Sequence, residues 1–185
     1  TRAVCKLDGP PQPKIPVTDS TLKRIRDSLD FTKRVSLVVW TGLRVALAFL
    51  CRISEWGFRE KHSLKWYAVA FFDKDRKQLH IESVCALANI FEVELTFFSD
   101  KTHNFGEGTC RSFFAITDQA DDRCIARDLG RLWLISEKQL EHHVFSWAND
   151  TEGPTRARVS AVLKAAAVAD GIPAADISSH SLRVS

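Results

Sequence analysis

An arginine that ends an apolar run is the first candidate for chemistry in this sequence. Arg52 follows residues 37–50, which are nearly all apolar, and Glu55 comes three residues after it. A guanidinium there is costly if it is buried without a partner. Glu55 can hold one edge of the guanidinium and leave the other edge for a phosphate or carboxylate. An ordinary ion pair at a helix end is the alternative interpretation.

A second candidate group lies at the other end of the chain. His180 and Arg183 are three residues apart, so a helix would place them on one face, and the serines before them suit a helix start. The separation of Arg52 and Arg183 along the chain suits one compact domain that folds both ends onto one site. Two guanidiniums and an imidazole that meet would form a site for an anion.

Together with one lysine, these residues resemble the tyrosine recombinases, also called phage-type integrases. The resemblance rests on three short motifs in order: Arg52-Ile53-Ser54-Glu55, the turn Ser99-Asp100-Lys101-Thr102, and His180-Ser181-Leu182-Arg183. They match the first arginine box, the hairpin lysine and the His-x-x-Arg box of that family. After Lys101 comes Phe105-Gly106-Glu107-Gly108, which is similar to recombinases of eukaryotic retroelements and related mobile elements. The resemblance covers residues 17–185.

A competing arginine box lies just upstream. Thr41-Gly42-Leu43-Arg44 also imitates the first box, because many recombinases have these residues there. Arg52 is the preferred candidate, since Ser54 and Glu55 follow it and no acidic residue follows Arg44 within a turn. If Arg44 bound the phosphate, Arg52 would be the surplus charge.

The resemblance implies a mechanism without metal or cofactor. Arg52 and Arg183 would clamp the non-bridging oxygens of one phosphodiester and neutralise charge in the transition state. Lys101 would act as general acid toward the departing 5′ oxygen, and His180 would assist proton transfer. Glu55 would orient Arg52. The implied partner is double-stranded DNA, with a tetramer on DNA in the full-length protein.

The family's nucleophile is a tyrosine that follows the His-x-x-Arg box, and this chain has none there. Tyr67 is the only tyrosine, and its apolar neighbours favour a packing role. We therefore expect a fragment of a longer product that binds DNA but cannot cleave or join it. The alternatives are a decayed, non-catalytic DNA-binding remnant of a mobile element, a type IB topoisomerase-like domain, and an unrelated protein with chance motifs.

Composition limits these interpretations. The 185 residues are 45% hydrophobic and 26% charged with a net charge of +3, which is typical of one soluble globular domain, so a basic surface must be local. Five cysteines without a C-x-x-C motif favour free thiols in an intracellular compartment, the nucleus if the source is eukaryotic. His142 and His143 are interpreted as surface or packing residues, and no metal site is expected.

The hydrophobic pattern predicts an α+β fold, mainly helical, with a small antiparallel sheet, as in recombinase catalytic domains. Residues 1–16 contain four prolines and are expected to form an extended linker before a partial catalytic domain at 17–185. Helices are expected from about 18, at 33–56, 123–135 and 155–169, and after 179; strands at 66–72, 79–84, 93–98 and 110–116. The strands would form two hairpins, and Lys101 would lie in the loop of the second one.

Overall fold

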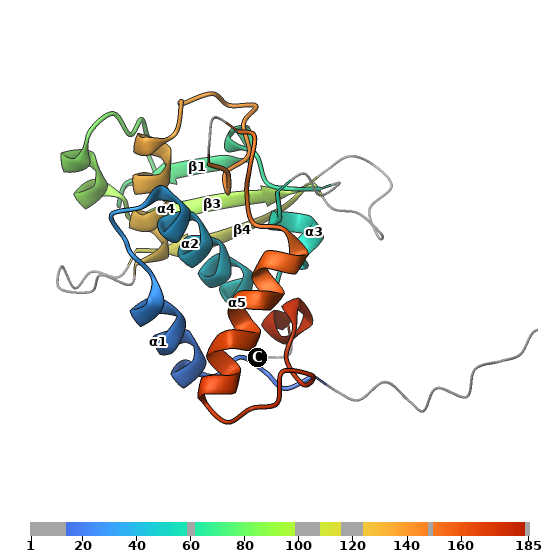
Figure 1. Cartoon of the computed structure of the whole chain (residues 1–185). Coiled ribbons are helices and arrows are strands. Elements are labelled where there is room, and N and C mark those ends of the chain that lie inside the picture. The colour runs from blue at the N-terminus through green and yellow to red at the C-terminus, as the bar shows by residue number, and fades with distance from the viewer. Residues whose placement is uncertain (1–13, 59–61, 99–107, 116–123, 148–149, 184–185) are drawn as a thin grey trace, which may run out of the picture.

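The computed structural model describes residues 14–58, 62–98, 108–115, 124–147 and 150–183 (Figure 1). The helices are α1 (Asp19–Ser28), α2 (Arg34–Ala48), α3 (Ile53–Trp56), α4 (Ile125–Ile135) and α5 (Arg156–Ala169), with the short 3-10 helices η1 (Trp66–Ala68), η2 (Val84–Asn89) and η3 (Ser179–Arg183). The strands are β1 (Val69–Phe72), β2 (Gln78–Leu79), β3 (Glu92–Phe97) and β4 (Thr109–Phe114). The chain is therefore α+β, as predicted.

The four strands form one antiparallel sheet in the order β2-β1-β3-β4. Both predicted hairpins are confirmed: β1 pairs with β2, and β3 pairs with β4 from Glu92 opposite Phe114 to Phe97 opposite Thr109. The second arm of the first hairpin is shorter than predicted, because the chain leaves β1 after Leu79. The alternating apolar residues of β3, such as Val93 and Leu95, are fully buried.

Helix α2 runs through the middle of the molecule (Figure 1). It is apolar around most of its circumference, and Val38, Leu43 and Val45 are fully buried. It contacts α4, α3 and η3, while α1 packs against α5. Segments far apart in the sequence therefore meet on α2.

Among the described helices, none is long and apolar enough to cross a membrane.

The helix predicted at 33–56 is wrong in its second half. Helix α2 ends at Ala48, and Leu50 adopts the left-handed conformation with φ 52°. The backbone N–H of Cys51 donates to the carbonyl of Ala46 at 2.9 Å, and the N–H of Leu50 to that of Leu47 at 3.3 Å, which is the Schellman arrangement. Glycine usually occupies the left-handed position, so a leucine there gave the sequence no stop signal.

The other helices begin and end close to the predicted residues. The hydroxyl of Thr18 accepts the N–H of Thr21 at 3.2 Å and starts α1, while Gly171, with φ 77°, follows the end of α5. Most of the predicted linker, residues 1–13, lies outside the described residues. Its last part is held to the domain, because the N–H of Ile15 donates to the carbonyl of Asp176 at 2.9 Å.

Candidate functional site

Arg52 lies at the start of α3 instead of inside a continuous helix. Its backbone N–H donates to the Glu55 carboxylate at 2.5 Å, and its guanidinium lies 3.6 Å from the other Glu55 oxygen. The Glu55 side chain is only 8% exposed, whereas that of Arg52 is 52% exposed. Glu55 thus holds Arg52 from the protein side, and much of the guanidinium faces solvent, where an anion can reach it.

The short helix that carries Arg52 is fixed to α2 by an aromatic side chain. Trp56 is buried, and a Cβ built on Gly42 would lie 2.6 Å from its ring. The same ring meets Phe145 edge-on, with centroids 5.8 Å apart. Because only glycine leaves room for this contact, Gly42 sets the distance between α2 and α3. The position of Arg52 therefore depends on a residue of the competing box.

Arg44, the arginine of that competing box, lies in the interior. Its side chain is 13% exposed, and its Nη1 lies 2.9 Å from the Asp128 carboxylate on α4. Arg131 pairs with the other oxygen of Asp128 at 2.8 Å. Burial raises the pKa of Asp128, and the charges of Arg44 and Arg131 offset part of that rise. Arg44 thus joins α2 to α4, and its charge is used within the protein.

The hairpin of β3 and β4 packs against the segment that leads to Arg52. The ring of Phe49 lies 6.2 Å from that of Phe97 at the end of β3 and 6.2 Å from that of Phe113 on β4. The guanidinium of Arg111 on β4 donates to the carbonyl of Phe49. Lys101 falls in the connection between the two strands, outside the described residues. The hairpin that carries this lysine is nevertheless anchored beside the end of α2.

The His-x-x-Arg motif forms η3, which contacts α2. The N–H of Ser178 donates to the hydroxyl of Ser181 at 3.1 Å, and the hydroxyl of Ser178 accepts the N–H of His180 at 3.2 Å. Leu182 is fully buried and holds the turn to the core, whereas His180 is exposed. Arg183 ends η3, but its side chain is outside the described residues. No hydrogen bond or ion pair joins Arg52 to His180 in the described part of the chain.

Tyr67 packs at the surface and not in the core. Its side chain is about half exposed, its ring lies 5.9 Å from that of Phe98, and the Lys65 ammonium lies 6.0 Å from it. The predicted packing role thus holds in part, because about half of the residue is exposed. This tyrosine belongs to η1, which precedes β1.

The two adjacent histidines are held by neighbouring residues. Nδ1 of His143 lies 3.0 Å from both carboxylate oxygens of Asp150, and its ring contacts Phe58 with centroids 4.9 Å apart. His142 lies 3.5 Å from Glu137. No group of three or more His, Cys, Asp or Glu residues within the described ranges could hold a metal ion. His143 therefore packs against Phe58, and His142 lies beside Glu137.

The sequence did not indicate two residues that shape this region. Asp128 pairs with Arg44 between α2 and α4, and Arg111 donates a hydrogen bond to the carbonyl of Phe49 just after α2. Each acts across a large separation in sequence, so no local motif could have revealed it. An aspartate on a helix and an arginine in a strand are both common, so the residue types gave no signal either.

Comparison with protein-family models, with curated proteins and with solved structures found no match. The resemblance to tyrosine recombinases therefore rests on the residues of this chain alone.

Proposed function

We propose that this chain is the DNA-binding catalytic core of a tyrosine recombinase. In this proposal Arg52, Arg183 and His180 surround one phosphodiester of double-stranded DNA. Lys101 protonates the departing 5′ oxygen, and Glu55 fixes the orientation of Arg52. Assembly as a tetramer on DNA, and a nuclear location in a eukaryotic source, are further parts of the same resemblance.

One observation supports the proposal above all others: the arginine of the first box is half-exposed and oriented, whereas the competing arginine is mostly covered and paired. Arg52 keeps 52% of its side chain exposed while Glu55 holds it. The Arg44 guanidinium is paired with the Asp128 carboxylate. A charge that must bind an external phosphate has to be open to solvent and held in place, and Arg52 meets both conditions.

A second line of support is that the first box, η3 and the strands on either side of residues 99–102 lie beside α2 or the residue that follows it. The first box follows α2 directly, η3 contacts α2, and the lysine hairpin contacts Phe49. In Figure 1, η3 lies toward the end of α2 that leads into α3. One helix thus supports segments from the beginning, middle and end of the domain, as a shared phosphate site requires.

The proposed chemistry lacks a nucleophile within this chain. Tyr67, the single tyrosine, precedes β1 and lies far upstream of the His-x-x-Arg motif in the sequence. We therefore expect this polypeptide to bind DNA without forming a phosphotyrosyl bond. A denaturing gel with nicked duplex DNA checks this expectation. A covalent adduct that Tyr67→Phe abolishes would contradict it.

Salt-dependent binding of duplex DNA tests the proposal. Affinity should fall steeply as salt rises, because phosphate contacts release counterions. Arg52→Ala should weaken binding about tenfold and reduce the slope of log affinity against log salt by about 1. Thermal unfolding of the same variant shows whether the fold is intact.

Arg76→Ala is the matched control. Arg76 is also exposed and also paired with carboxylates, those of Glu92 and Glu94, but it lies at the end of the sheet opposite the lysine hairpin. Its loss should leave DNA affinity and the salt slope nearly unchanged. Equal effects of the two variants would show that DNA is held by nonspecific charge attraction and not by a site at Arg52. Absence of salt-sensitive binding would reject the recombinase proposal.

A further inference from the structure

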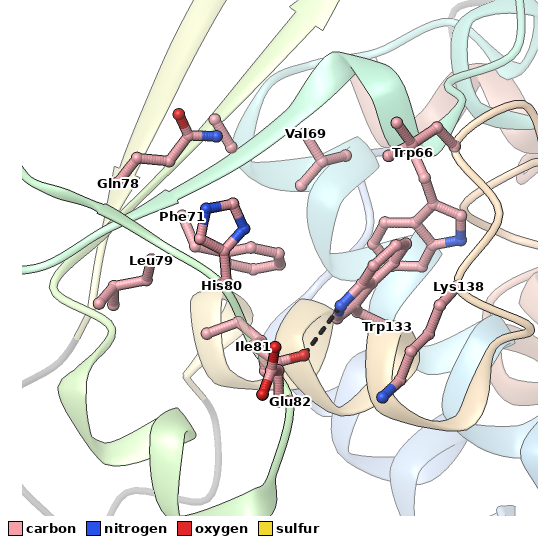
Figure 2. A pocket seen from close by; sticks show the side chains of 12 residues that line it. Trp66, Val69, Phe71, Gln78, Leu79, His80, Ile81, Glu82, Trp133 and Lys138 are labelled. Carbon is pink, nitrogen blue, oxygen red and sulfur yellow. Dashed lines mark hydrogen bonds between the residues drawn. The ribbon is translucent and has the colours of Figure 1, made fainter.

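A cavity of about 670 Å³ lies at the free edge of the sheet, between β1, the chain after β2 and the segment after α4 (Figure 2). Its lining includes neither the first arginine box nor η3. Most of the lining is apolar or aromatic, with a few polar side chains among it. A cavity of this size and composition is typical of sites for small molecules.

The cavity exists because the first hairpin opens. Phe71 lies opposite Leu79, so a regular hairpin would continue with Val69 opposite Ile81. Instead, the carbonyl of Ile81 accepts the indole N–H of Trp133 at 3.0 Å, and the N–H of Val69 turns to the carbonyl of Trp66. Two specific bonds thus hold the arms apart, and the hollow between them is a built feature of the fold.

Two tryptophans form the aromatic wall of this hollow. The rings of Trp66 and Trp133 meet at 65° with centroids 5.2 Å apart, and Trp66 is only 3% exposed. The hydrogen bond to Ile81 fixes the ring of Trp133. The partly exposed Trp133 ring, packed on the buried Trp66, offers a rigid surface to a flat apolar group at a low entropic cost.

Two oppositely charged residues also line the cavity. Lys138 and Glu82 are both exposed, and Figure 2 shows them near Trp133. Neither forms an ion pair with any residue that the structure describes. Lys138 has a left-handed backbone, φ 55°, and its N–H donates to the hydroxyl of Ser136 at 3.1 Å. A lysine held in this uncommon conformation indicates that its position matters.

We propose that this cavity binds a small aromatic zwitterion of the α-amino acid class. The ring packs against the Trp133 indole, the carboxylate pairs with Lys138, and the ammonium pairs with Glu82. The two charged groups of such a ligand share one carbon and lie together between these side chains, whereas a purely anionic or cationic ligand would lie near a like charge. The site is separate from the proposed DNA contacts, so either proposal can fail without the other.

Indole N–H signals in an NMR titration with L-phenylalanine test the proposal. The chain has five tryptophans, and the spectrum of Trp133→Phe identifies the signal of Trp133. That signal should shift and saturate with a dissociation constant on the order of 1 mM or tighter. Phenethylamine, which lacks the carboxylate, and 3-phenylpropanoate, which lacks the ammonium, should both bind more weakly.

Charge-removing variants assign the two charged groups of the ligand. Lys138→Asn should weaken phenylalanine binding about tenfold without weakening phenethylamine binding, which loses a like charge, and asparagine tolerates the left-handed backbone. Glu82→Gln should weaken phenylalanine binding without weakening 3-phenylpropanoate binding, which also loses a like charge. Lys74→Asn, at an exposed lysine of the β1–β2 turn, is the control and should change nothing. No saturable shift, or an equal loss for all three probes in Lys138→Asn, would overturn the proposal.

Discussion

Two neighbouring stretches of this chain each resemble an arginine box, and they use their arginines in opposite ways. In the inner stretch, residues 41–44, Arg44 is buried and bound to Asp128 on another helix. In the outer stretch, residues 52–55, Arg52 is half-exposed and bound to Glu55 within the same turn. A local acid orients an arginine and leaves it open to solvent. A distant acid instead makes the arginine part of the packing between helices.

The two stretches also depend on each other. Gly42 of the inner stretch leaves the space that Trp56 fills, and Trp56 directly follows the outer stretch. The inner stretch thus supplies the surface on which the outer one rests. The resemblance of residues 41–44 to an arginine box is explained by packing, and the sequence motif alone does not distinguish the two roles.

Removal of Asp128 should have the largest effect on stability. Asp128→Ala leaves Arg44 nearly buried without its carboxylate, and loss of one partner of a buried pair costs about 3 kcal/mol of unfolding free energy. Urea denaturation measures the loss. Arg44→Met combined with Asp128→Leu should recover much of it, because no charge is then left unpaired. A loss under about 1 kcal/mol would mean that Arg44 finds water or another partner, and the contrast with Arg52 would weaken.

Gly42→Ala should come next. In an exposed helix, alanine would be favoured over glycine by about 0.5–1 kcal/mol. Here the added Cβ meets the buried ring of Trp56 at 2.6 Å, and overpacking of this kind costs about 1–3 kcal/mol, so destabilisation should win. Chemical denaturation measures the result. Trp56→Leu in the Gly42→Ala background should make the added methyl less costly, and an unchanged cost would reject the packing explanation.

Much of the fold could be predicted because its signals are local. Apolar periodicity and capping residues located α1, α4 and α5, and alternation located β3. The break at Leu50 could not be predicted, since it depends on a Schellman turn without glycine. The early end of β2 depends on Trp133 of α4, whose indole N–H donates a hydrogen bond to the carbonyl of Ile81.

The candidate site was predictable only where its contacts are local. The pairing of Arg52 with Glu55 followed from their spacing, although the helix expected between them begins only after Arg52. The preference for Arg52 over Arg44 used the absence of a nearby acid. The structure adds that Arg44 is paired with Asp128 on α4, which sequence spacing could not reveal.

Acid titration should separate Asp128 from Asp170 by the sign of its effect. The pKa of Asp128 is raised by burial, so its ionisation costs stability that is regained as pH falls below that raised value. The pKa of Asp170 is lowered by the hydrogen bond from Arg24, so its contribution is present above the ordinary aspartate range and is lost as pH falls through the lowered value.

Two asparagine variants measure this contrast. As pH falls from neutral toward 3, the difference in unfolding free energy between the wild type and Asp170→Asn should shrink. The difference between the wild type and Asp128→Asn should move the other way in favour of the wild type. Denaturant unfolding at a series of pH values gives both slopes. Slopes of the same sign would show that the arginines around Asp128 outweigh its burial, and the pair of Arg44 and Asp128 would then be stronger than the raised pKa of Asp128 indicates.

Arg52→Ala should have the smallest effect on stability. An ion pair whose arginine is half-exposed contributes about 0.2–1 kcal/mol, and Glu55 keeps its hydrogen bond to the backbone N–H of residue 52. Urea denaturation beside Asp128→Ala should therefore show a clear gap between the two variants. If Arg52→Ala lost as much stability as Asp128→Ala, the outer arginine would be structural too. A nearly unchanged stability with weakened DNA binding would instead assign the outer arginine to an external phosphate, because a side chain that the fold does not need would then be needed by the ligand.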